Sequence, residues 1–105
     1  IDGSPSPSWT AYASAKSALS TLSKYAASEL GPYGIRVNQV APGMTETNFI
    51  GDVPEKARLI AARQAPLRKL ATPLDVANTV AFLASDKSDH LTGETIRVNG
   101  GMVML

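Results

Sequence analysis

The first third of the chain carries apolar and polar residues at helical spacing. Steps of four and three residues place one stripe on a single helix face: Tyr12, Lys16, Leu19, Ser23, Ala26 and Leu30. This pattern predicts a helix that runs to about Leu30, with Ser8 or Thr10 as its N-cap and Tyr12 in or near its first turn. Gly31 followed by Pro32 predicts the end of the helix, with Gly31 as the C-cap.

Two short segments read as strands. Residues 35–41 are rich in β-branched side chains and are bounded by Gly34 and Pro42, as expected for a buried strand. Residues 94–98 have the same character and are closed by Asn99-Gly100-Gly101.

Between the strands the sequence predicts two more helices. One spans about Pro54–Gln64 after an Asp cap, and the other begins at Thr72-Pro73-Leu74-Asp75 and ends near Ser85-Asp86. The order is therefore helix, strand, helix, helix, strand. Strands joined by long helical crossovers are parallel, so the predicted fold class is α/β.

In such a fold, ligands bind at the sheet edge where the carboxyl ends of the strands meet. Helix N-termini lie at that same edge. We therefore expect Tyr12 and Lys16, at a helix start, to meet the loop from Pro42 to Asn48, which follows a strand.

Composition narrows the function classes. The chain has 105 residues, 44% of them hydrophobic, and a formal net charge of +1, which is typical of one soluble globular unit. The ten Lys and Arg look dispersed, which argues against nucleic acid, and no apolar run approaches the roughly 18 residues of a membrane helix. The sequence has no Cys and opens on no signal segment, so the expected compartment is the cytoplasm. His90 is expected at the surface.

Tyr12 and Lys16 are the candidate catalytic pair. Four residues apart, they share one helix face, and a nearby ammonium stabilises a phenolate over a phenol. Tyr12 is therefore a candidate proton donor and acceptor. The same spacing also fits a Lys stem that simply packs beside a half-buried Tyr.

Three motifs in order resemble those of the short-chain dehydrogenases/reductases, over nearly the whole chain. They are Tyr12-x-x-x-Lys16, then Asn38-Gln39-Val40-Ala41-Pro42-Gly43 with Thr47 four residues on, and then Leu83-Ala84-Ser85-Asp86 followed by Leu91-Thr92-Gly93-Glu94-Thr95-Ile96 and Val98-Asn99-Gly100-Gly101. The resemblance implies a Rossmann-like, doubly wound parallel sheet. It also implies an oxidoreductase that passes hydride between a nicotinamide, NADP or NAD, and an alcohol or carbonyl carbon.

The resemblance assigns roles to individual residues. Tyr12 would protonate the carbonyl oxygen, and Lys16 would stabilise the phenolate and hydrogen-bond the nicotinamide ribose. Pro42 and Gly43 would let the backbone pass close to the nicotinamide, and the N–H of Thr45 would contact its carboxamide.

The loop that follows Thr45 is less constrained. Thr47 would reach the carboxamide or the pyrophosphate, although an N-cap of the next helix explains Thr47 equally well. Residues from Met44 to about Leu70 match the family's variable substrate lid.

The chain also departs from the family pattern. The Gly-rich phosphate loop, the selector for the adenosine ribose and the catalytic Ser belong upstream of Tyr12, and Ser4, Ser6 and Ser8 lie too close to Tyr12 to replace that Ser. Residues 1–105 are therefore expected to be the C-terminal portion of one Rossmann-like catalytic domain. Alone, they are expected to be inactive.

The substrate and the partners follow only from the resemblance. The stretch from Leu91 to Met104 and the Tyr-Lys helix look most like bacterial 3-oxoacyl-carrier-protein reductases, which implies a 3-oxoacyl thioester, carried in some cases on an acyl carrier protein. A sugar, polyol or steroid dehydrogenase of the same family, or a non-catalytic fragment or interaction module, remains an alternative. A small-residue face on the first helix and the apolar tail Met102–Leu105 suggest a homo-oligomer, a dimer or tetramer.

Overall fold

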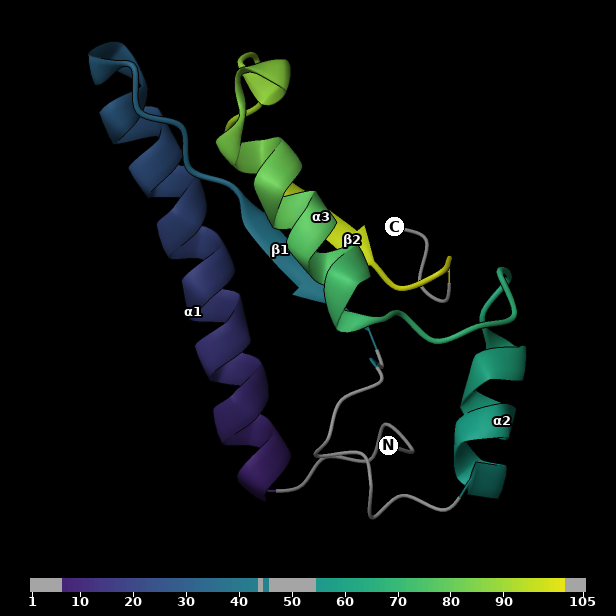
Figure 1. Cartoon of the computed structure of the whole chain (residues 1–105). Coiled ribbons are helices and arrows are strands. Elements are labelled where there is room, and N and C mark those ends of the chain that lie inside the picture. The colour runs from purple at the N-terminus through teal and green to yellow at the C-terminus, as the bar shows by residue number, and fades with distance from the viewer. Residues whose placement is uncertain (1–6, 44, 46–54, 102–105) are drawn as a thin grey trace. The chain divides into compact units, whose positions relative to one another are not determined.

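The computed structural model of this chain describes residues 7–43, 45 and 55–101. Its elements follow the predicted order of helix, strand, helix, helix, strand (Figure 1). In chain order they are α1 (Pro7–Leu30), η1 (Gly31–Tyr33), β1 (Gln39–Pro42), α2 (Glu55–Gln64), α3 (Pro73–Ala84), η3 (Asp86–Ser88) and β2 (Thr95–Val98). The fold class is α/β, as predicted.

The chain divides into two compact units. The first contains α1, η1 and the residues up to Gln39, together with residues 92–94. The second contains residues 40–91 and the chain from Thr95 onward, and so includes α2, α3 and η3.

The start of α1 differs from the prediction. The helix begins at Pro7, so Ser8 and Thr10 lie inside it and neither is its N-cap. Tyr12 is the sixth helical residue and lies in the second turn. Proline suits a first helical position because it needs no N–H partner there, so a helix can start at Pro7.

Helix α1 ends at Leu30, as predicted, but Gly31 is not its left-handed C-cap. Gly31 and Pro32 continue the chain as the short helix η1, and the left-handed residue is Gly34, with φ of 76°. The N–H of Gly34 donates to the carbonyl of Gly31 over 2.9 Å. Proline is tolerated in the first turn of η1, so the chain turns only where a glycine can adopt positive φ.

The strands β1 and β2 pair as a two-stranded parallel sheet. The N–H of Gln39 donates to the carbonyl of Glu94 over 2.8 Å, and the N–H of Gly43 donates to Val98 over 2.9 Å. Both partners advance by four residues in the same direction, which is the parallel register.

Strand β1 starts four residues later than predicted. In the residues before it, hydrogen bonds to side-chain oxygens take the place of the backbone bonds between strands. The N–H of Val37 donates to the hydroxyl oxygen of Thr92 over 3.1 Å, and Asn38 Oδ1 accepts from the N–H of Glu94 over 3.1 Å. These bonds satisfy backbone donors without strand pairing. Residues 35–38 are therefore not part of β1.

Helix α3 starts where the sequence predicts. Asp75 N–H donates to the Thr72 hydroxyl over 3.1 Å, and Thr72 N–H donates to Asp75 Oδ2 over 2.8 Å, which completes a capping box. Helix α3 packs against β2 and η3 (Figure 1). Ser88 is buried in η3, where its hydroxyl donates to the carbonyl of Leu83 over 2.8 Å.

Few apolar side chains are buried. Among the described residues, the buried apolar ones are Ala27 in the first unit and Ala65 and Leu70 in the second. In the second unit, Leu67 N–H donates to the carbonyl of Gly100 over 3.1 Å, which ties the segment after α2 to the end of β2. The apolar faces of the helices remain largely exposed.

Candidate functional site

The predicted pair of Tyr12 and Lys16 is brought together on α1. Lys16 Nζ lies 5.6 Å from the centroid of the Tyr12 ring, on the same face of the helix and about one turn away. A cation at this distance is attracted to the ring by its quadrupole, by about 0.5–1 kcal/mol at an exposed site. The helical spacing alone therefore holds the ammonium near the phenol.

Both members of the pair are open to a ligand. Tyr12 is 55% exposed, and Lys16 is exposed as well. A phenol can give or take a proton, so Tyr12 is chemically able to serve as a proton donor.

The end of β1 and the residues after it hold the predicted cofactor residues of the second unit; Pro42 is the last residue of β1 and not, as predicted, the residue that bounds it. Pro42 is exposed, and Gly43 and Thr45 are partly buried. The Thr45 hydroxyl donates to the carbonyl of Gly43 over 3.0 Å, and Thr45 pairs with Ala71 in an isolated parallel bridge. These bonds tie Thr45 to Gly43 and to the segment that precedes α3.

Thr47 lies outside the described residues, as do residue 44 and the rest of 46–54 in the predicted lid, which extends from Met44 to about Leu70. The meeting of the Tyr12–Lys16 pair with the loop after β1 at one sheet edge stays a prediction.

Gly43 has a packing role that the sequence analysis did not identify. A Cβ at this position would lie 2.8 Å from the Cβ and 3.1 Å from the Cα of Asn99. Real Cβ atoms do not approach so closely, so a side chain at position 43 would displace the end of β2. The local sequence marks Asn99 only as the residue that follows a strand. Its contact with Gly43 joins residues 56 positions apart, so no local pattern predicts it.

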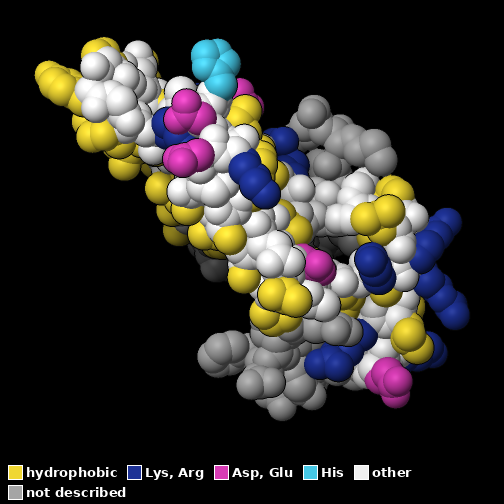
Figure 2. Space-filling view, turned by 45° about the horizontal axis from the view of Figure 1, so that its top comes forward, with side chains coloured by type: hydrophobic (Ala, Val, Ile, Leu, Met, Phe, Trp, Pro, Cys, Tyr) yellow, Lys and Arg dark blue, Asp and Glu magenta, His cyan; other side chains and the backbone are white. Residues whose placement is uncertain are grey.

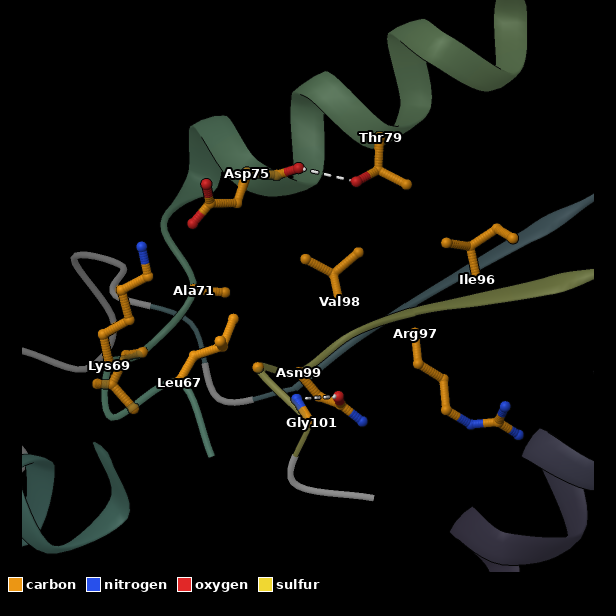
Figure 3. A pocket seen from close by; sticks show the side chains of 12 residues that line it. Leu67, Lys69, Ala71, Asp75, Thr79, Ile96, Arg97, Val98, Asn99 and Gly101 are labelled. Carbon is orange, nitrogen blue, oxygen red and sulfur yellow. Dashed lines mark hydrogen bonds between the residues drawn. The ribbon is translucent and has the colours of Figure 1, made fainter. Parts of the chain in front are cut away.

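A cavity of the second unit is lined from three segments (Figure 3): the chain after α2, helix α3 and the end of β2. Two of its polar groups form hydrogen bonds within their own segments. The Thr79 hydroxyl donates to the backbone carbonyl of Asp75 over 2.9 Å, and the Gly101 N–H donates to Asn99 Oδ1 over 3.0 Å (Figure 3). These bonds support the helix and the strand end.

Among the described titratable groups, Asp75 is the one whose pKa is clearly shifted. The pKa of its carboxyl is lowered from the ordinary value of 3.8, first by the hydrogen bond from the Thr72 backbone N–H and then by the bond with the Thr72 side chain. The positive charge of Lys69 adds a smaller lowering, against a small opposing effect of desolvation. The ionised Asp75 therefore belongs to the capping box of α3.

Other site types receive no support from the described residues. Within 7–43, 45 and 55–101, no group of three or more His, Cys, Asp and Glu side chains could hold a metal ion. His90 is exposed, as predicted. In that same part of the chain, no helix combines the length and the apolar character needed to cross a bilayer.

Comparison with known proteins gives consistent results. A family profile described as enoyl-(acyl carrier protein) reductase matches residues 3–103. A 3-oxoacyl-[acyl-carrier-protein] reductase from Thermotoga maritima is 43% identical over 98 residues, which are 93% of this chain and 40% of that protein. One from Rickettsia felis is 41% identical over 102 residues, which are 97% of this chain and 42% of that protein.

A solved structure shows the same fold. The crystal structure of a 3-oxoacyl-[acyl-carrier protein] reductase from Brucella melitensis superposes with a TM-score of 0.83 at 38% identity, over 90% of this chain and 35% of that one. The described elements are therefore those of an α/β, Rossmann-like fold. The chain spans about two fifths of the length of the curated relatives it matches.

Proposed function

Because this chain belongs to the short-chain dehydrogenase/reductase family, we propose that it supplies the proton-transferring part of an oxidoreductase that interconverts a carbonyl and a secondary alcohol. The observation that carries the proposal is the Tyr12–Lys16 pair, with the ammonium 5.6 Å from the ring centroid. The names of the relatives favour a 3-oxoacyl thioester as the substrate, borne on an acyl carrier protein.

Tyr12 and Lys16 have distinct tasks in this reaction. The Tyr12 phenol donates its proton to the carbonyl oxygen of the substrate as the alcohol forms, and takes a proton back in the reverse direction. Lys16 stabilises the phenolate that remains, because opposite charges attract across a short distance. Placing both groups on one turn of a helix keeps them in register without any further ordering cost.

The residues are chemically suited to a nicotinamide dinucleotide, either NADPH or NADH. When bound, the reduced nicotinamide supplies the hydride. Lys16 keeps N–H donors for the ribose hydroxyls, since its contact with the Tyr12 ring uses the charge of the ammonium. Pro42 and Gly43 would let the backbone pass close to the nicotinamide, the N–H of Thr45 would contact its carboxamide, and the hydroxyl of Thr47 would reach the carboxamide or the pyrophosphate.

The protein is further proposed to be a cytoplasmic homo-oligomer, a dimer or tetramer. Leu22 and Tyr25 are each 65% exposed on α1 and lie beside the small side chains of Ser14, Ser17 and Ala18. A contiguous set of exposed apolar side chains marks a contact surface, and the small residues allow close helix approach. Sedimentation of the full-length protein as a monomer would contradict this.

The activity is tested on the full-length product of the reading frame that holds this sequence. The purified protein is mixed with NADPH or NADH and an acetoacetyl thioester, a sugar, a polyol or a ketosteroid, and loss of the reduced cofactor's absorbance is followed. We expect the thioester to give the highest kcat/KM. Absence of carbonyl-dependent oxidation with every substrate would sink the proposal, and preference for another carbonyl class would replace the thioester. The 105-residue chain alone, which contains no Gly-x-Gly-x-x-Gly loop, is expected to show no turnover.

A further inference from the structure

Positive charge is concentrated in one part of the second unit. Five of the ten Lys and Arg fall within residues 55–69, where Glu55 is the only acidic residue: Lys56, Arg58, Arg63, Arg68 and Lys69. This segment has a formal charge of +4, against +1 for the whole chain. The cations form no long continuous run, but half of them lie in this one segment. Figure 2 shows Lys and Arg side chains gathered on one region of the visible surface.

Two of these five side chains are less available to a partner than the others. Arg68 Nη1 donates to the backbone carbonyl of Arg63, which holds its guanidinium back against the end of α2. Arg58 is partly buried, and its Nε is inaccessible to water. Lys56 and Arg63 are the exposed cations on the helix itself.

Lys56 and Arg63 frame two exposed apolar side chains. Lys56, Leu59, Ile60 and Arg63 follow one another by three, one and three residues, which places them on one stripe of α2. Leu59 is 52% exposed and Ile60 is 49% exposed. We call this stripe the α2 face: two apolar side chains in the middle, with a cation about one helical turn away on either side.

We propose that the α2 face is a docking surface for an acidic protein, and that this partner is the carrier that delivers the thioester substrate. The proposal rests on the proposed function for the identity of the partner. The chemistry of the partner is argued from charge complementarity. Its carboxylates would meet Lys56 and Arg63, and an apolar patch between them would cover Leu59 and Ile60.

The combination of side chains selects this class of partner. A small anion would use the two cations but leave Leu59 and Ile60 in water, because it has no apolar surface to bury them. A second copy of the chain would bring a like-charged face against this one in a twofold contact, and like charges repel. An acidic protein surface with an apolar centre satisfies both features of the α2 face.

The test compares two forms of one substrate in the full-length protein. The double variant Lys56→Gln/Arg63→Gln removes both cations and keeps side chains of good helix propensity. We expect kcat/KM for an acetoacetyl carrier protein to fall about tenfold and to depend less on salt, since steering charges act on association. Lys56 and Arg63 lie within the predicted substrate lid, so kcat/KM for acetoacetyl-N-acetylcysteamine, which lacks the carrier, should also fall, but by a clearly smaller factor.

A matched control removes the same charge elsewhere. Lys24→Gln/Lys87→Gln takes two exposed cations from α1 and η3 and also lowers the net charge by two. If this variant loses as much carrier-dependent activity as the first, net charge and not the α2 face is responsible, and the proposal is overturned. Leu59→Ala/Ile60→Ala should also lower kcat/KM with the acetoacetyl carrier protein more than kcat/KM with the carrier-free thioester.

Other outcomes are equally decisive. Equal losses with both substrates would show that the α2 face serves folding or the reaction itself. A changed sedimentation coefficient in the Lys56→Gln/Arg63→Gln variant would assign the face to a second copy, and binding to anionic vesicles, but not to the carrier protein, would assign it to a membrane. Calorimetric titration with the carrier protein tests the face without turnover, so a protein that binds the carrier but reduces neither substrate would refute the proposed function and leave the docking surface standing.

Discussion

Gly43 and Asn99 approach each other so closely that a Cβ on Gly43 would lie 2.8 Å from the Cβ of Asn99. The contact joins the end of β1 to the end of β2, and the Gly43 N–H donates to the carbonyl of Val98 over 2.9 Å beside it. The glycine is therefore required by packing at this position, independently of any ligand that the loop binds.

Gly43→Ala should lower the free energy of unfolding of the full-length protein by about 1–3 kcal/mol, the usual cost of overpacking. Urea unfolding measures it. Gly31→Ala is the matched control, because a Cβ at Gly31 meets nothing within 4 Å. Asn99→Gly in the Gly43→Ala background should recover part of the loss, since it removes the nearer of the two contacts. Equal stability of Gly43→Ala and Gly31→Ala would contradict the clash.

Thr72→Ala should destabilise the protein by about 0.5–2 kcal/mol, because it removes the side-chain acceptor for the Asp75 N–H at the start of α3. Thermal or urea unfolding would detect this. The control is Thr79→Ala, whose hydroxyl only back-bonds to a carbonyl within the helix and whose loss is offset by the better helix propensity of Ala. The capping role would be refuted if the two variants lost equal stability.

Asp75 should make the free energy of unfolding depend on pH. The pKa of its carboxyl is lowered in the folded chain by the Thr72 hydrogen bonds, so the folded state binds its proton less tightly than the unfolded state does. The stabilisation is fully present above the ordinary pKa of 3.8 and is lost as the pH falls through the lower, folded value. Wild type should exceed Asp75→Asn in stability at neutral pH, and the difference should shrink below about pH 4. A difference that is constant with pH would contradict this.

Tyr12→Phe should lower turnover of the full-length enzyme by about a hundred- to ten-thousand-fold, because it removes the transferable proton. Cofactor affinity should be preserved, since the ring and its contact with Lys16 remain. Steady-state kinetics and cofactor titration measure the two effects separately. Tyr25→Phe, on the same helix, is the control and should keep its activity. Near-normal turnover of Tyr12→Phe would remove Tyr12 from the reaction.

Lys16→Ala should harm both turnover and cofactor binding, because one ammonium serves the phenolate and the ribose hydroxyls. Lys24→Ala removes a cation two turns further along α1 and should change neither. The dissociation constant of NADPH or NADH is measured by titration. An unchanged constant in Lys16→Ala, together with reduced turnover, would leave the phenolate role and refute the ribose contact.

Local sequence determined the elements whose signals are short in range. The Thr72-Pro73-x-Asp75 start of α3 was predictable because the capping box closes within four residues. The approach of Lys16 to Tyr12 was equally predictable, because a helix brings residues four apart together whatever surrounds it. The family resemblance also rested on such local motifs.

Tertiary structure decided the features that depend on residues far apart in the chain. The start of β1 is set by Thr92 and Glu94, which bond to Val37 and Asn38 across 55 and 56 positions. The packing need for Gly43 came from Asn99 in the same way. A local pattern shows which conformations a segment favours, but a backbone donor's partner and the space beside a glycine are properties of the neighbour that folding brings there.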